Sequence, residues 1–234
     1  VKNHMLEFLA WHNWIVENHS DAFTIFTHPS GFNNDRHRRT DTHELRPTDR
    51  SGQWPLPRFW GITFSGIANL NSMIIAFESA PDEATFKANF IAQARTIRAY
   101  FYLKGMELYG DMPIVTTASP EPGEPLPSRQ PMSEVFAFIE NELLEAIPDL
   151  PSGRPENLTD ISQEGARAIL SKLYLNAEVF TGTPRWQDCL DQCNLILAGP
   201  GYGMADNYFD MFKVNNADLT PQEFLVFSQP IAGV

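Results

Sequence analysis

The sequence predicts an all-α fold, a tetratricopeptide-like helical stack (an α-α superhelix) with long irregular loops. Apolar residues recur at steps of three and four along several long segments, which is the period of an amphipathic helix. No segment with the alternation of a β-strand approaches these segments in length. Short connections join them in pairs, as in stacks of about 34 residues per repeat.

The helices follow one another along the whole chain. We expect them at 3–19, 57–79, 83–109, 132–147, 163–181 and 185–198, with a short turn of helix near 206–212. Two of them carry clear apolar stripes that should face a core. The stripe of the third helix is Phe86, Phe90, Ala94, Ile97, Phe101, Gly105 and Leu108. The stripe of the fifth is Ala166, Ile169, Leu170, Leu173, Ala177 and Phe180.

Glycine and proline mark where these helices end. Gly110 suits the left-handed position after the third helix, and Pro113 prevents that helix from resuming. Pro148 ends the fourth helix after Ile147, because proline lacks the N–H that the next turn needs. Pro184 is tolerated just before the last long helix.

Two connections are longer than the rest. Residues 116–131 hold five prolines and therefore predict a stiff surface connection. Residues 27–56 form a predicted loop insertion without apolar periodicity, and loops of this length are usually functional or disordered. Its central part carries five arginines and four acidic residues, so it is slightly basic on a chain whose net charge is -12. We expect residues 1–234 to form a single helical domain.

Composition limits the possible functions. At 234 residues, 43% hydrophobic and 12% aromatic, the chain is long and apolar enough to bury a core. Its 29 acidic residues against 17 basic ones repel phosphate backbones, so nucleic acid is not an expected partner. The sequence contains no uninterrupted apolar run of the roughly 18 residues that suggest a membrane span.

A run of aromatic and turn residues resembles a known family. Arg98-Ala99-Tyr100-Phe101-Tyr102, followed by Leu108-Tyr109-Gly110-Asp111-Met112-Pro113-Ile114-Val115, is similar to a motif of the SusD/RagB family. The segments 134–151 and 165–183 resemble two further helices of that family, in the expected order. The resemblance implies the N-terminal, tetratricopeptide-containing part of such a protein. It places the family's lipidated cysteine upstream of Val1 and its C-terminal half beyond Val234.

The resemblance also implies a function. Members of the family are surface-exposed lipoproteins of the cell outer membrane, held there by an N-terminal lipid anchor. By resemblance, the chain binds an oligosaccharide or polysaccharide without catalysis or cofactor, and delivers it to a SusC-like TonB-dependent transporter. Peptide capture, as in RagB-like proteins, is one alternative. A helical-repeat scaffold for other proteins and a glycoside hydrolase are two more.

The predicted ligand-binding residues lie in the long loop. A sugar offers an apolar face and a rim of hydroxyl groups, which an exposed aromatic ring and polar side chains can bind. Trp54 lies in a Gly-Gln-Trp-Pro turn just before a helix, and Arg50, Gln53 and Asp41 are the polar residues we assign to the site. Trp54 is equally compatible with simply covering the start of the helix.

Other aromatic and charged residues have structural interpretations. Phe59 and Trp60 are expected in the core, and Trp11, Trp14 and Trp186 are expected to pack against other helices. We expect Arg95 and Arg98 to pair with acidic residues beside the core. Asp111 should bind backbone N–H groups at the turn that follows the third helix.

Histidine and cysteine give no metal site. All six histidines fall within the first 43 residues, but neither a His-x-His nor an HExxH spacing is present. Cys189 and Cys193 share a helix face and are expected to be buried thiols. Nucleotide-binding and serine-hydrolase motifs are missing from the sequence, and no pair of carboxylates stands out for glycoside hydrolysis.

Overall fold

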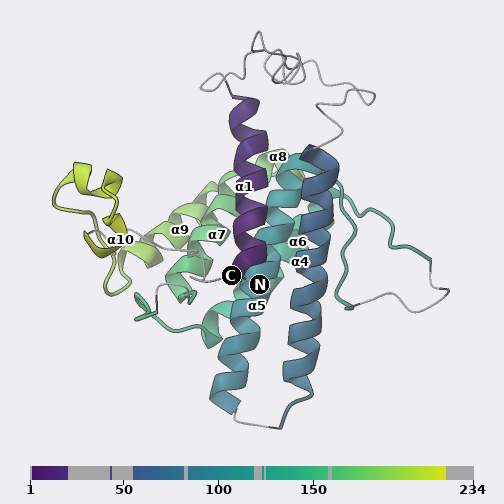
Figure 1. Ribbon diagram of the computed structural model, residues 1–234, viewed down its shortest axis with the longest axis horizontal. Coiled ribbons are helices and arrows are strands. Elements are labelled where there is room, and N and C mark those ends of the chain that lie inside the picture. The colour runs from purple at the N-terminus through teal and green to yellow at the C-terminus, as the bar shows by residue number, and fades with distance from the viewer. Residues whose placement is uncertain are drawn as a thin grey trace. The chain divides into compact units, whose positions relative to one another are not determined.

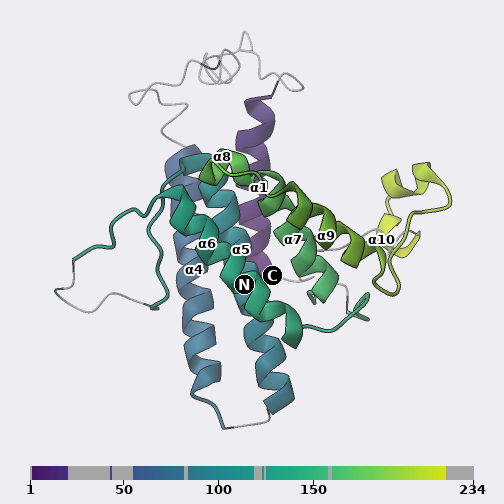
Figure 2. The same cartoon turned by 180° about the vertical axis from the view of Figure 1, so that it is seen from behind.

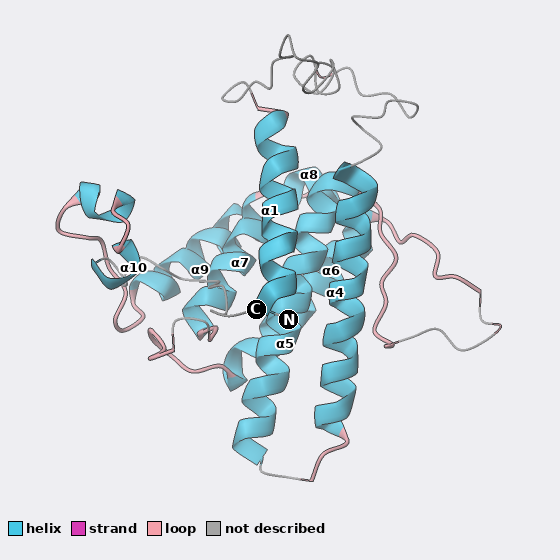
Figure 3. Ribbon diagram, in the orientation of Figure 1, coloured by secondary structure: helices cyan, strands magenta, loops and turns pink. Residues whose placement is uncertain are grey.

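The computed structural model describes residues 2–20, 43, 55–81, 84–118, 123, 125–157 and 160–219. Within these ranges the regular secondary structure is helical, and the one β feature is an isolated bridge between Met112 and Gln130 (Figures 1 and 3). The all-α prediction is therefore confirmed. The chain divides into two compact units, 1–66 with 230–234, and 67–229. The single domain over 1–234 stays a prediction.

The first unit pairs helix α1 (Lys2–Asn18) with the beginning of helix α4 (Pro55–Glu78). The rings of Phe8 and Phe59 lie 4.7 Å apart, and both side chains are fully buried. His4 Nε2 lies 2.6 Å from the carbonyl oxygen of Ile62. Since residues later in α1 contact residues earlier in α4, the two helices run antiparallel. The beginning of α4 lies beside the first half of α1, and the C-terminal end of α1 points the same way as the N-terminal end of α4.

The second unit begins with a long helical hairpin made of the rest of α4 and helix α5 (Ala84–Tyr109). Phe77 of α4 stacks on Phe90 of α5, with ring centroids 4.0 Å apart. Near the middle of the hairpin, Arg98 of α5 donates a hydrogen bond to Asn71 of α4. These contacts hold the two helices antiparallel.

The remaining helices of the second unit pack in a row that begins on α5 (Figure 2). Helix α6 (Met132–Ala146) lies on α5 and continues into a 3₁₀ turn, η1 (Ile147–Asp149). Helix α7 (Gln163–Leu175) lies on α6, and helix α9 (Trp186–Leu197) lies on α7. The short elements are α8 (Ala177–Thr181), η2 (Tyr208–Phe212) and α10 (Asn216–Leu219).

The apolar stripes locate the core of this unit. Every residue predicted for the stripe of 163–181 is buried. The stripe of α5 is buried at Ala94, Phe101 and Gly105, but Phe86 at its start is 64% exposed. Phe86 lies in the first turn of α5, near the closed end of the hairpin, and its ring contacts Phe77 and Phe90 there. The prediction that Phe86 faces the core is wrong.

Most helix boundaries agree with the sequence to within two residues. The predicted helix 163–181 is instead interrupted at Asn176, which separates α7 from α8. The Asn176 side chain donates a 3.0 Å hydrogen bond to the carbonyl oxygen of Lys172, and asparagine is prone to such local bonds. The predicted turn near 206–212 is the 3₁₀ helix η2, which Asn207 caps by accepting a hydrogen bond from the Phe209 N–H.

Three side chains of α9 are more exposed than the sequence suggested. Trp186 is 62% exposed, so its predicted packing role is wrong within the described chain. Cys189 and Cys193 are free thiols and only half-buried, which corrects the prediction of buried thiols. Burial and the neighbouring Cys193 raise the pKa of the Cys189 thiol. Helix α9 contacts α7 along one side, and none of its residues is buried.

Helix α4 is long and apolar enough, by length and composition, to cross a membrane. The core helix of a soluble protein can meet the same test, and 44% of the most apolar window of α4 is buried inside the protein. Phe59, Ile62, Ile67, Leu70 and Ile74 recur at steps of three to five and are all buried inside the protein. A polar residue, Asn71, is fully buried among them and hydrogen-bonded.

Two leucines of α7 test the position of the core. Leu170 is fully buried and Leu175 is 60% exposed. Leu170→Ala should lower the free energy of unfolding by about 2–5 kcal/mol, because it leaves a cavity. Leu175→Ala should change it by less than about 0.5 kcal/mol. Urea unfolding of both variants measures the difference, and equal effects would contradict the placement of this stripe.

Candidate ligand-binding site

The four residues predicted to bind ligand, Trp54, Arg50, Gln53 and Asp41, lie outside the described residues. The structure does describe what holds the two ends of their segment. Helix α1 ends at Asn18, and α4 begins at Pro55, directly after Trp54. The antiparallel α1–α4 pair brings these two ends to the same end of the first unit. An ion pair between Arg58 and Glu7, 2.5 Å apart, joins the beginning of α4 to the first half of α1.

One residue inside the segment is also described. His43 has a positive φ of 57°, a conformation that is uncommon for residues other than glycine. Its Nε2 atom lies 2.7 Å from the carbonyl oxygen of His19, just after α1. When Nε2 carries the proton, this contact satisfies a carbonyl group at the helix end. His43 therefore ties the middle of the predicted loop to the end of α1.

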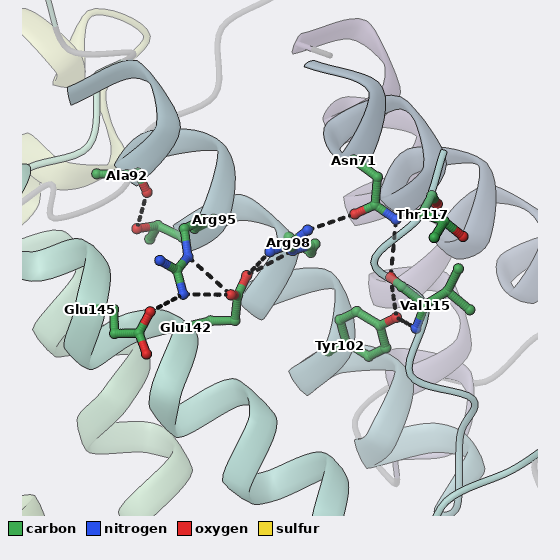
Figure 4. Close-up of polar contacts among 10 residues, drawn as sticks. Asn71, Ala92, Arg95, Arg98, Tyr102, Val115, Thr117, Glu142 and Glu145 are labelled. Atoms are coloured by element: carbon green, nitrogen blue, oxygen red, sulfur yellow. Dashed lines mark hydrogen bonds and ion pairs between the residues drawn. The ribbon is translucent and has the colours of Figure 1, made fainter. Parts of the chain in front are cut away.

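A buried carboxylate lies between α5 and α6 (Figure 4). Glu142 of α6 is 4% exposed and lies between two arginines of α5. Arg98 donates from Nε to Glu142 Oε2 over 2.7 Å, and Arg95 donates from Nε to Glu142 Oε1 over 3.0 Å. Arg95 also binds Glu145, which is exposed. The predicted pairing of both arginines with acidic residues is confirmed, and it fastens α6 to α5.

The same arginine reaches the loop that follows α5. Arg98 donates from Nη1 to the Asn71 side-chain oxygen over 2.7 Å. Asn71 in turn donates from Nδ2 to the carbonyl oxygens of Val115, at 3.0 Å, and Thr117, at 2.8 Å. Figure 4 shows the resulting chain of contacts from Glu142 through Arg98 and Asn71 to the loop. Ion pair and loop therefore form one network.

Tyr102 holds the same loop from the next turn of α5. Its phenol oxygen accepts the Val115 N–H over 2.8 Å and donates to the Val115 carbonyl oxygen at 3.2 Å. Arg98 and Tyr102 are four residues apart, so both side chains lie on one face of α5. The four-residue spacing of Arg98 and Tyr102 is visible in the sequence and is enough to predict that they share a face of α5. Asn71 gave no comparable signal.

The base of the loop is closed by the turn after α5. Gly110 has φ 70°, as predicted for the left-handed residue past the helix end. Met112 and Gln130 exchange two backbone hydrogen bonds of 3.1 and 2.9 Å. Asp111 Oδ1 accepts the N–H of Met132, the first residue of α6, over 3.0 Å. Asp111 thus has a structural role, as predicted, but its partner is the N–H at the start of α6 and not one in the turn after α5, which corrects the prediction.

These contacts show what the aromatic and turn motif does in the described chain. Its arginine is held in an ion pair with Glu142 of α6, its Tyr102 binds the loop, and its Asp111 accepts a backbone N–H of α6. Arg98 and Glu142 are too buried to meet a ligand from solvent. The network therefore shapes the loop 113–131 and does not itself form a binding surface.

A second buried charge lies further along α5. Lys104 is 5% exposed, and its Nζ is 2.8 Å from Glu107 Oε2. Lys172 of α7 reaches the other oxygen of Glu107 at 3.5 Å. Burial lowers the pKa of the Lys104 ammonium group, and Lys172 adds to that effect while Glu107 opposes it. This cluster links α7 to α5 as Glu142 links α6 to it.

The described histidine, cysteine and acidic side chains offer no metal centre. Within the ranges that the structure covers, no three of them are grouped so that they could hold a metal ion. His4 and His43 both face backbone carbonyl oxygens. His28 and His37 fall outside the described residues.

Burial raises the pKa of Tyr102 to about 12, because the phenolate loses its hydration. A raised pKa means that the neutral phenol stabilises the fold below pH 10 and that this stability is lost as the pH rises toward 12. Tyr102→Phe removes both bonds to Val115 and should lower the free energy of unfolding by about 1–2 kcal/mol at pH 8.

The pH dependence of that difference is the sharper test. The gap in unfolding free energy between wild type and Tyr102→Phe should be constant up to about pH 10 and should then narrow, since only the wild type has this phenol to ionise on unfolding. Denaturant titrations at several pH values measure the gap. A gap that widens above pH 10 would contradict the assignment.

Comparison with known proteins shows which family the sequence resembles. Residues 10–175 match the SusD-like family, which is described as starch-binding and associating with the outer membrane. The starch-binding protein SusD of Bacteroides thetaiotaomicron is 25% identical over 150 residues, which cover 64% of this chain and 26% of that protein.

Solved structures show the same fold. A SusD-like protein from Bacteroides fragilis superposes with a TM-score of 0.77 at 16% identity, over 98% of this chain and 44% of that one. A structure solved with a xylogluco-oligosaccharide has a TM-score of 0.69 at 23% identity, over 83% of this chain and 39% of that one. The chain thus spans less than half the length of each of these relatives. Because the family match extends over most of the chain and includes the α5 motif, the chain belongs to the SusD-like family.

Proposed function

We propose that this protein binds an oligosaccharide or polysaccharide without catalysis. The family match over residues 10–175 carries the proposal, because it includes the whole segment with Trp54. Two observations on relatives support it. One of them is a starch-binding protein, and another was solved with a xylogluco-oligosaccharide.

The binding residues in this proposal are Trp54, Arg50, Gln53 and Asp41. Trp54 supplies a flat apolar surface for a sugar ring, and the three polar side chains exchange hydrogen bonds with its hydroxyl groups. Pro55 begins α4 directly after Trp54, and the α1–α4 pair supports both ends of the segment.

Among the described residues, the bonding of the two buried carboxylates, Glu142 and Glu164, supports binding over hydrolysis. A glycosidase needs two carboxyl groups about 5–9.5 Å apart that are free to act as acid and base or nucleophile. Both oxygens of Glu142 are bound by arginines. Glu164 Oε2 accepts the N–H of Gly153 over 2.9 Å, and Glu164 is 3% exposed. These two groups serve the fold.

The second part of the proposal is delivery of the ligand to a transporter, and it rests on the same family match. We infer that the protein acts at the cell outer membrane as a surface lipoprotein and passes its ligand to a SusC-like TonB-dependent transporter. Exchangeable stacking and hydrogen bonds give modest affinity, which permits release. Peptide capture is the second candidate, because the predicted loop is slightly basic on an acidic chain.

A glycan array with matched variants tests this proposal. The purified protein should bind one class of polysaccharide, and Trp54→Ala should weaken binding by about tenfold, or about 1.4 kcal/mol. Phe86→Ala removes an exposed aromatic ring on α5, far along the sequence from the predicted site, and should leave affinity unchanged.

Each other outcome has a definite meaning. Binding that survives Trp54→Ala would keep the function and reject the site. Binding to no glycan, with binding to peptides, would replace the proposal by peptide capture. Release of reducing sugar by the purified protein would contradict a non-catalytic role.

A further inference from the structure

Helices α6 and α7 are both attached to α5 through buried charges, but the charges differ in kind. At α6, Glu142 is bound by Arg98 and Arg95. At α7, Glu107 is approached by two lysines, Lys104 and Lys172. Arginine is not deprotonated in proteins, whereas the pKa of a lysine shifts readily when its side chain is buried. Of the two attachments, the one at α7 can therefore lose positive charge as the pH rises.

The lysine cluster places two ammonium groups on one carboxylate. Lys104 Nζ is 2.8 Å from Glu107 Oε2, and Lys172 Nζ is 3.5 Å from Glu107 Oε1. The two lysines differ in exposure, since the side chain of Lys104 is 6% exposed and that of Lys172 is 49% exposed. One carboxylate cannot neutralise two ammonium groups, so the buried cation keeps a like charge beside it.

Two tyrosines close to the cluster stay neutral while the lysines titrate. The ring of Tyr100, one turn earlier on α5, lies 5.7 Å from Lys104 Nζ. Burial, and then the charge of Glu107, raise the pKa of Tyr100 to about 12. Later on α7, Tyr174 donates to Glu140 of α6 over 2.6 Å, and burial followed by this bond raises the pKa of its phenol as well. Above neutral pH, the titration of the cluster is therefore that of its lysines.

The burial of Lys104 has a definite sign. Burial lowers the pKa of the ammonium group below its usual value of 10.5, and Lys172 adds to that effect while Glu107 opposes it. If α7 moves away from α5, Lys104 regains water and binds its proton more tightly than in the closed state. Because the opened state holds more protons, a rise in pH from the lowered pKa toward 10.5 favours the closed state.

We propose that Lys104, Glu107 and Lys172 form a pH-sensitive attachment of α7 to α5, which tightens as the pH rises above neutral, while the arginines on Glu142 hold α6 to α5 unchanged over the same range. The device adjusts one helix of the row and leaves its neighbour fixed. It rests on contacts within the second unit and not on sugar binding, so it stands or falls independently of the proposed function.

Hydrogen exchange of backbone amides in the purified protein tests the attachment. Leu173 and Tyr174 are buried in the last turn of α7. The equilibrium constant for opening of their amides, corrected for intrinsic exchange rates, should fall by about threefold or more between pH 7 and pH 9. Ile139, buried in α6, is the matched control and should keep a constant value. Equal changes in α6 and α7, or no change in α7, would overturn the proposal.

Three substitutions separate this attachment from a general effect of pH. Lys104→Met replaces the ammonium group by an apolar side chain, so the pH dependence of α7 opening should disappear. Lys172→Met removes the like charge beside Lys104, so the dependence should persist but weaken. Lys213→Met is the matched control, because Lys213 also pairs with an acid three residues away, Asp210 at 2.6 Å, but its side chain is 54% exposed. A pH dependence that survives Lys104→Met and disappears in Lys213→Met would contradict the proposal.

A direct titration needs no change at Lys104 itself. The NMR signal of its ε-methylene group follows the protonation of the neighbouring amine. In the wild type this signal should report a pKa below 10.5, and Lys172→Met should raise it. A pKa at or above 10.5 in the folded wild type, or one that Lys172→Met leaves unchanged, would overturn the assignment.

Discussion

The buried carboxylate of Glu142 is the constraint on which the second unit depends. Its two oxygens are bound by Arg98 and Arg95, so α6 is fixed along α5. Arg98 also donates from Nη1 to Asn71, which holds the loop through Val115 and Thr117. A charge this deeply buried is strongly destabilising once it loses its partner. Two helices and a loop are thereby committed to one arrangement.

The family motif has a physical explanation in this arrangement. Its arginine and tyrosine lie on one face of α5, and both act on the segment that leaves the helix. Its glycine permits the left-handed turn, and its aspartate caps the next helix at Met132. The bridge between Met112 and Gln130 then closes the loop at its base. The residues of the family motif therefore build the connection from α5 to α6. The proposed ligand site lies in a different segment, the predicted loop before α4.

Periodicity was sufficient to predict the helices, since burying an apolar stripe is what fixes them. The α7–α8 stripe was right at every residue, but the break at Asn176 depends on a local side-chain bond that no period reveals. Trp186 was expected to pack because tryptophan is apolar, but its side chain is 62% exposed, because the sequence alone does not show which side of α9 meets α7. Asn71 was overlooked because a polar residue in an apolar helix becomes a hub only through contacts distant in sequence. The ligand site rests on a loop without periodicity, so its residues were predicted from chemistry and resemblance alone.

A double-mutant cycle between Asn71→Ala and Glu142→Gln tests most directly whether this network acts as a unit. Glu142→Gln should lower the unfolding free energy by about 3–5 kcal/mol, because it leaves two arginines short of a carboxylate. The two residues do not touch in the structure but share Arg98. The account predicts that the losses are not additive: the double variant should lose less unfolding free energy than the sum of the two single variants, by at least about 1 kcal/mol. Losses that add to within about 0.5 kcal/mol would show that Glu142 and Asn71 act separately, and would contradict the account.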